Sequence, residues 1–257
     1  MTAGTLAGRH ALVTGAGKGT GAAIVAALSS AGAAVTLLGR DRSGLERTAA
    51  RCPGRSHVVC ADVTDPAALR AAIADASSAI GAVDVLVNNA GAAASEPFHR
   101  STDEAWQWML ALNMTGPRVA MREVLPGMLA RDYGRIVNIA STAGLTGYAY
   151  TAAYCAAKHG LVGLTRSVAR EVARRNITVN AVCPGYTDTE MVENAVSNIV
   201  AKTGRSRAEA LGALTANNPQ GRLVRVEEVA STVLWLCSPG SESVTGQSIL
   251  LAGGELM

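Results

Sequence analysis

Short apolar runs alternate along the chain with longer segments whose apolar residues recur at helical spacing. The runs are almost entirely apolar and do not alternate with polar residues, which is typical of strands buried on both faces of a parallel sheet. Regular alternation of strand and helix predicts an α/β fold with a doubly wound parallel sheet. The expected strands are 11–15, 34–38, 57–61, 83–87, 135–140, 177–182 and 248–252.

The expected helices lie between these strands, at 22–31, 43–51, 65–80, 102–130, around Tyr154 and Lys158, and at 226–237. The alternation stops only between residues 186 and 221, where helices at 189–202 and 206–216 replace a strand. The first of them carries an apolar stripe that includes Met191, Val192, Val196 and Ile199, so this insertion is either a substrate lid or a packing helix. With no linker or repeat, residues 1–257 are expected to form one domain.

A glycine-rich turn at residues 14–21 follows the first strand and opens the first helix. Its glycines Gly15, Gly19 and Gly21 permit a tight turn and close approach to a pyrophosphate, and the helix N-terminus offers free N–H groups. Strand, glycine turn and helix are the arrangement of a dinucleotide site. The alternative is a turn that only packs the helix against the strand.

The end of the second strand bears on which dinucleotide fits. An acidic residue there would accept hydrogen bonds from the ribose 2′-hydroxyl, whereas an arginine suits a 2′-phosphate. Gly39 and Arg40 occupy this point, Lys18 is available from the glycine turn, and Asp41 lies beyond the strand end. The sequence therefore predicts NADP(H), unless Arg40 is simply a solvated loop charge.

Tyr154 and Lys158 are four residues apart, so on a helix they share one face. A neighbouring ammonium favours the phenolate, and we expect it to bring the tyrosine pKa closer to working pH. Ser141 follows the apolar run 135–140 and could hold a substrate oxygen beside the phenol. Alone, this spacing also arises by chance in many helices.

The composition limits the remaining classes of function. The net charge is +3 and no basic run is interleaved with aromatic residues, so a nucleic-acid partner is not expected. No run of 18 apolar residues is present and five cysteines are scattered without metal-ligand spacing, so we expect no membrane partner and no metal site. A cytoplasmic protein is expected.

Together these motifs resemble the short-chain dehydrogenase/reductase family over essentially the whole chain. The matching positions are Thr14-Gly15-x3-Gly19-x-Gly21, Asp62, Asn88-Asn89-Ala90-Gly91, Asn113, Ser141, Tyr154-x3-Lys158 and Pro184-Gly185. The resemblance implies a Rossmann-type fold and hydride transfer between a nicotinamide and a carbonyl or alcohol carbon. Residues 251–254 depart from it, because Ala252 stands where relatives usually carry aspartate.

The resemblance also implies roles for single residues. Tyr154 would be the general acid, Ser141 would position the substrate oxygen, Lys158 would lower the phenol pKa and hold the nicotinamide ribose, and Asn113 would order a proton-relay water. Asn88 would stabilise the sheet edge. The expected cofactor contacts are Gly15, Lys18, Gly19, Thr20, Gly21, Arg40, Asp62, Val63, Asn89, Ala90, Gly91, Tyr154, Lys158, Pro184, Gly185, Thr187 and Thr189.

Within the family, the chain looks most like 3-oxoacyl-thioester reductases and polyketide ketoreductases. We therefore expect an NADPH-dependent ketoreductase and, by the same resemblance, a homotetramer. The alternatives are a secondary-alcohol or hydroxysteroid dehydrogenase working oxidatively and a non-catalytic cofactor-binding regulator. A substrate carried on coenzyme A or an acyl carrier protein would suit the basic residues after position 189, which are Lys202, Arg205, Arg207, Arg222 and Arg225.

Overall fold

Seven parallel strands form one sheet, in the order β3-β2-β1-β4-β5-β6-β7. A computed structural model of the protein describes residues 4–256. The order reverses at β1, from which the chain winds outward first to β3 and then to β7, so the expected doubly wound parallel sheet is confirmed. The strands are β1 (His10–Thr14), β2 (Ala34–Gly39), β3 (Ser56–Cys60), β4 (Val85–Asn88), β5 (Gly134–Ile139), β6 (Ile177–Pro184) and β7 (Ser248–Leu251).

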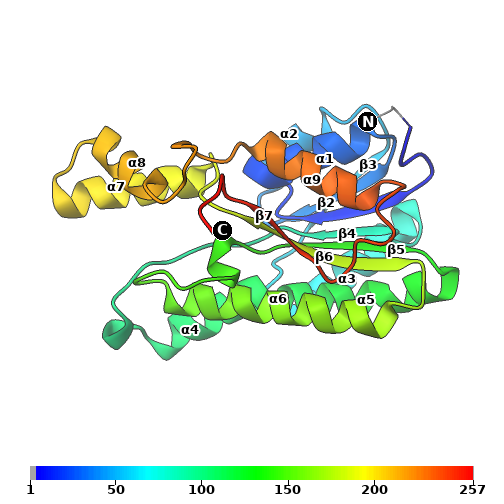
Figure 1. Cartoon of the computed structure of the whole chain (residues 1–257). Coiled ribbons are helices and arrows are strands. Elements are labelled where there is room, and N and C mark those ends of the chain that lie inside the picture. The colour runs from blue at the N-terminus through cyan, green and yellow to red at the C-terminus, as the bar shows by residue number, and fades with distance from the viewer. Residues whose placement is uncertain (1–3, 257) are drawn as a thin grey trace.

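Helices cover both faces of the sheet (Figure 1). On one face lie α1 (Gly19–Ser30), α2 (Arg42–Ala49) and α9 (Val226–Cys237), with α1 and α9 in extensive contact. On the other lie α3 (Pro66–Ile80), α4 (Asp103–Leu110), α5 (Gly116–Arg131) and α6 (Ala152–Val172). Each layer has its own apolar core, which explains why the strands read as continuous apolar runs. Within residues 4–256, none of the helices has the length and apolar character needed to span a bilayer.

The long helical stretch expected at 102–130 is interrupted. Between α4 and α5, residues Ala111–Thr115 form a π-helical segment that contains Asn113. Its wider turn gives Asn113 a position from which the side-chain amide donates a hydrogen bond to the carbonyl of Ala92, in the loop after β4, at 3.0 Å. The expected helical stretch is therefore present, and the π-helical turn at Asn113 is a feature that the sequence did not signal.

Helices α7 (Glu190–Thr203) and α8 (Arg207–Thr215) extend beyond the end of the sheet (Figure 1). Val192 and Val196 of the predicted stripe are buried against Ala210 of α8, in a small apolar cluster of their own, whereas Met191 is exposed. Much of the stripe therefore packs α7 onto α8, as the packing interpretation expected. The prediction that the exposed part of this stripe, including Met191, covers a substrate stays a prediction.

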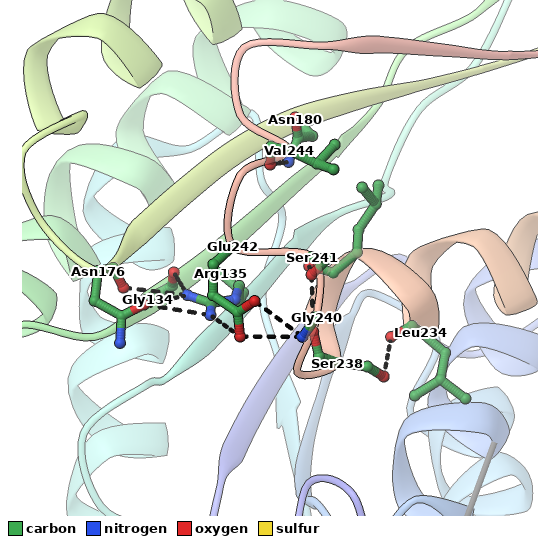
Figure 2. A network of polar contacts seen from close by, with 11 residues as sticks. Gly134, Arg135, Asn176, Asn180, Leu234, Ser238, Gly240, Ser241, Glu242 and Val244 are labelled. Atoms are coloured by element: carbon green, nitrogen blue, oxygen red, sulfur yellow. Dashed lines mark hydrogen bonds and ion pairs between the residues drawn. The ribbon is translucent and has the colours of Figure 1, made fainter.

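Polar contacts near the starts of β5 and β6 hold the segment that leads into β7 (Figure 2). The buried guanidinium of Arg135 donates to the carbonyl oxygens of Gly134 and Asn176 and lies 3.9 Å from the Glu242 carboxylate. Asn180 of β6 donates to the Val244 carbonyl at 2.7 Å. These contacts hold residues 240–246 against β5 and β6, and they set where β7 and the chain end after it lie.

Candidate active site

The carboxyl ends of the parallel strands meet at one edge of the sheet, and the expected site residues follow them. Thr14 ends β1, Asn88 ends β4, Ser141 lies just after β5 and Pro184 ends β6. Asn88 donates to Asn138 of β5 at 2.8 Å, which ties the neighbouring strands together as expected for a sheet-edge role. The fold thus brings distant motifs to the edge where α/β sheets bind ligands.

The glycine-rich turn is fastened to the end of β4. Thr14 Oγ1 accepts hydrogen bonds from the backbone N–H groups of Asn89 and Ala90, both at 3.0 Å, and the Asn89 amide donates to the carbonyls of Thr14 and Gly15. Gly15 has a φ of 64°, and a Cβ on Gly21 would overlap the Gly15 carbonyl oxygen. Both side-chain N–H groups of Asn89 therefore donate hydrogen bonds to the turn. Its expected contact with a ribose stays a prediction.

Tyr154 and Ser141 form the proposed reacting pair. Ser141 Oγ accepts from the Ala143 backbone N–H at 3.1 Å and lies near enough to the phenol of Tyr154 to affect its pKa. Burial raises the pKa of Tyr154 to about 12, although the neighbouring Ser141 hydroxyl lowers it. We expected Lys158 to lower this pKa, and in the structure desolvation dominates instead. A phenol with so high a pKa is fully protonated at neutral pH, as a proton donor must be.

Lys158 and Asn113 lie on the other side of the same small volume. Lys158 is buried, its Nζ donates to the Ile139 carbonyl at 2.8 Å, and it lies 5.6 Å from the centre of the Tyr154 ring. A Cβ on Gly91 would lie 2.9 Å from Asn113 Oδ1 and 3.6 Å from Lys158 Nζ, so only glycine leaves this space open. Burial lowers the pKa of Lys158 to about 8, because the ammonium has lost most of its water.

Arg40 lies where the sequence placed it, just after β2. Its side chain is 72% exposed, and the guanidinium forms a loose ion pair with Asp62 at 3.5 Å. Burial raises the pKa of Asp62, but the hydrogen bonds from Thr64 and the Arg40 charge together hold it below its usual value. Asp41, the competing acid, accepts a hydrogen bond from Ser43 at 2.8 Å at the start of α2. An exposed, weakly held arginine is available to a phosphate.

Lys18 does not lie beside Arg40. Its ammonium forms an ion pair with Glu190 in the first turn of α7, because the turn that carries Lys18 lies under the start of that helix. Thr189 Cγ2 would lie 3.4 Å from a Cβ on Gly19 in the same contact. A role for Lys18 in reading a 2′-phosphate requires this pair to open and stays a prediction.

The other expected cofactor residues line the same edge. Thr187 is buried and donates to the Gly185 carbonyl at 3.1 Å, and Thr189 donates to the Thr187 carbonyl at 3.2 Å. Thr20 is half-buried in the first turn of α1, and Val63 is buried beside Asp62. The carboxamide and adenine contacts expected of this group stay predictions.

Three of the five basic residues expected to form a cationic rim are already paired. Arg207 forms a bidentate ion pair with Glu193, while Arg222 and Arg225 both contact Glu228. Lys202 and Arg205 have no ion pair within residues 4–256 and remain exposed. The rim is thus less cationic than the sequence suggested.

Sequence reasoning missed three residues that lie near the proposed reacting pair. Tyr148 Oη donates to Glu255 Oε1 at 2.5 Å, and Tyr186 follows the Pro184-Gly185 turn close to both Tyr154 and Glu255. The position of Tyr186 directly after the Pro184-Gly185 motif is a sequence signal that could have identified it. Nothing in the sequence signals that Glu255, near the chain end, returns to the site.

The arrangement fits a nicotinamide dinucleotide. The crowded glycines of the turn and Gly91 keep side chains away from the ends of β1 and β4, and Asn113 Oδ1 is buried without a hydrogen-bond partner within the described part of the chain. An acceptor of this kind suits a water or a hydroxyl group of a bound molecule. Among residues 4–256, no three histidine, cysteine or acidic side chains are grouped to hold a metal ion.

Comparison with known proteins agrees with this geometry. The sequence profile of the short chain dehydrogenase family matches residues 9–199. A protein named as ketoacyl reductase 1 of the granaticin polyketide synthase of Streptomyces violaceoruber is 41% identical, covering 98% of this chain and 95% of its own length.

Two further proteins extend the comparison. The 3-oxoacyl-acyl-carrier-protein reductase FabG of Vibrio cholerae is 36% identical, with 98% of this chain and 99% of that protein covered. The crystal structure of a variant of actinorhodin polyketide ketoreductase with NADPH superposes with a TM-score of 0.93, at 38% identity and over 99% of both chains.

The lowered pKa of Lys158 has a consequence for stability. Between pH 8 and the unfolded value of 10.5 the unfolded chain binds more protons than the folded chain, so stability rises with pH there. Below pH 8 the buried ammonium costs the folded state about 3 kcal/mol. Lys158→Met should therefore be stabilised relative to wild type at pH 7, by a margin that shrinks as the pH rises through 8 towards 10.5.

Urea denaturation at a series of pH values from 7 to 9.5 measures this margin. Lys202→Met, at an exposed lysine of α7, is the matched control and should show no pH-dependent margin. A margin for Lys158→Met that stays constant or widens with pH would contradict the assignment of a buried ammonium.

Proposed function

This chain belongs to the short chain dehydrogenase family, and we propose that it is an NADPH-dependent ketoreductase that reduces a carbonyl group to an alcohol. The observation that carries the proposal is the convergence of Tyr154, Ser141, Lys158 and Asn113 beside the glycine-rich turn. The names of the relatives, which are ketoacyl reductases, and the NADPH in the similar actinorhodin enzyme support it.

In this proposal the four residues divide the work of proton transfer. NADPH, when bound, supplies the hydride. Ser141 and Tyr154 hold the substrate oxygen by hydrogen bonds, and Tyr154 delivers the proton to that oxygen as the carbon is reduced. The positive charge of Lys158 stabilises the phenolate left behind, and Asn113 Oδ1 accepts a hydrogen bond from a water through which the proton is replaced.

Two sets of residues would hold the cofactor. The backbone of the glycine-rich turn and the N-terminus of α1 would bind the pyrophosphate, and Arg40 would bind the 2′-phosphate. Lys158 would contact the nicotinamide ribose, while Thr187 and Thr189 would lie at the carboxamide. The same residues serve the reverse reaction, so oxidation of a secondary alcohol is the alternative direction.

For the substrate, a 3-oxoacyl thioester on coenzyme A or an acyl carrier protein is the finer proposal. It rests on the names of the relatives and on the exposed Lys202 and Arg205. Since Arg207, Arg222 and Arg225 are held in ion pairs, only part of the expected rim is free to attract an anionic carrier. The thioester therefore belongs in a panel beside quinones, steroids and simple ketones.

Loss of NADPH absorbance over that carbonyl panel tests the reaction, and Tyr154→Phe tests the acid. The variant keeps the ring and loses the donated proton, so kcat should fall by about 10²–10⁴-fold while NADPH binding persists. Tyr150→Phe, at an exposed tyrosine of the preceding loop, is the control and should keep the wild-type rate. Near-wild-type kcat in Tyr154→Phe would refute the assignment.

Arg40→Ala tests the choice of cofactor. A charge-assisted hydrogen bond contributes about 1.5–3 kcal/mol, so NADPH affinity should fall by roughly 10–150-fold and NADH affinity should hardly change. Arg42→Ala is the matched control, because Arg42 is exposed and paired with Glu46 on α2. Equal losses for NADPH and NADH in Arg40→Ala would show that Arg40 does not bind the 2′-phosphate.

We also propose that the protein assembles as a homotetramer. On α6, Gly160 packs against Met114 within the same chain, but Gly163 is exposed and a Cβ there would meet no atom within 4 Å. A small exposed residue permits close approach of a second copy. Light scattering at micromolar concentration should give about four times 26.2 kDa, and Gly163→Arg should lower that mass. A wild-type monomer would remove this proposal.

A further inference from the structure

The chain end returns to the active-site edge of the sheet. After β7, Gly253 and Gly254 have φ values of 59° and 96°, and this turn brings Glu255 to Tyr148, in the loop that precedes α6. The Gly185 N–H donates to the Leu251 carbonyl at 2.9 Å and the Glu255 N–H to the Ala252 carbonyl at 3.0 Å. The position of Glu255 is thus fixed by backbone contacts on both sides of the turn.

The two oxygens of the Glu255 carboxylate have different surroundings. Oε1 accepts a hydrogen bond from the phenol of Tyr148 at 2.5 Å. Oε2 would lie 3.1 Å from a Cβ on Gly185, in the turn that follows β6. Within residues 4–256 no hydrogen bond reaches Oε2, and no cationic side chain forms an ion pair with this carboxylate.

This carboxylate lies beside two segments that flank the proposed reacting pair: Tyr148 is in the loop between Ser141 and Tyr154, and Gly185 directly follows β6. Burial raises the pKa of Tyr186, and the negative charge of Glu255 raises it further. Tyr186 in turn contributes to the raised pKa of Tyr154, after desolvation. Tyr148 and Glu255 therefore lie at the same edge of the sheet as Ser141 and Tyr154.

We propose that Glu255, held by Tyr148, determines substrate specificity by accepting a hydrogen bond from a hydroxyl group of the substrate near the reacting carbonyl. The inference rests on the proposed ketoreductase function and adds a substrate class to it. An ionised carboxylate only accepts hydrogen bonds, so its uncommitted oxygen suits a hydroxyl and repels a substrate carboxylate. Hydroxylated ketones are therefore favoured over ketones that carry a carboxylate.

A purely structural role makes a different prediction. If the pair of Tyr148 and Glu255 only fastens the chain end, breaking it should lower stability and reduce turnover of every substrate by the same factor. Glu255→Gln separates the two cases, because the glutamine oxygen still accepts from Tyr148 while the charge is removed. Tyr148→Phe does the reverse, since it removes the contact and keeps the charge.

The test uses three ketones with one carbon skeleton: unsubstituted, hydroxylated on the carbon beside the carbonyl, and carboxylated at the same place. Wild-type kcat/KM should favour the hydroxylated ketone over the unsubstituted one by about 10-fold or more, the size expected for a hydrogen bond to a charged group. Glu255→Gln should lose most of this preference and gain on the carboxylated ketone. Glu227→Gln, an exposed glutamate of α9, should keep the wild-type ratios.

Calorimetric binding of the same three compounds to the protein with NADPH provides a readout that does not depend on turnover. A binding preference for the hydroxylated compound that Glu255→Gln removes supports the inference, even if turnover is absent and the proposed reaction fails. Ratios that are the same in wild type and Glu255→Gln, by turnover and by binding, would overturn it and leave Glu255 as an anchor for the chain end.

Discussion

Burial of the Lys158 ammonium is the constraint on which the site depends. Removing such a charge from water costs several kcal/mol, and the Ile139 carbonyl offsets only part of that cost. The surroundings of the Lys158 ammonium leave room beside it. Gly91 has no side chain to fill the space next to Nζ, and Asn113 Oδ1 lies at the same space. A cation held in a poorly solvated site acts strongly on charge that develops nearby, which is what the proposed proton donation by Tyr154 requires.

The parallel sheet supplies the positions that this chemistry needs. Because every strand runs the same way, Thr14, Asn88, Ser141 and Pro184 lie at one edge although they are far apart in the sequence. The hydrogen bonds from Asn89 then join the glycine-rich turn to the end of β4, so the turn and the sheet form one frame. The apolar cores on both faces stabilise that frame, and the polar edge is left for binding.

The alternation of strands and helices, the glycine turn and the pairing of Tyr154 with Lys158 could be predicted because each depends on local spacing. What could not be predicted depends on packing in three dimensions. Two examples are contacts between residues that are far apart in the chain: the ion pair between Lys18 and Glu190, and the hydrogen bond between Tyr148 and Glu255. A third example is the π-helical segment at Asn113, which no residue pattern signals. The raised pKa of Tyr154 was missed for the same reason, since spacing reveals a neighbouring charge and not the loss of water around the phenol.

In the proposed reaction the substrate carbon receives its hydrogen directly from the cofactor and not from solvent. Reduction of an accepted ketone with NADPH deuterated at the transferable C4 position, in ordinary water, tests this directly by NMR of the alcohol. The account predicts one deuterium on the carbinol carbon of each product molecule, and none on that carbon when unlabelled NADPH is used in heavy water. Deuterium that reaches the carbinol carbon from solvent, or label that never leaves the cofactor, would contradict it.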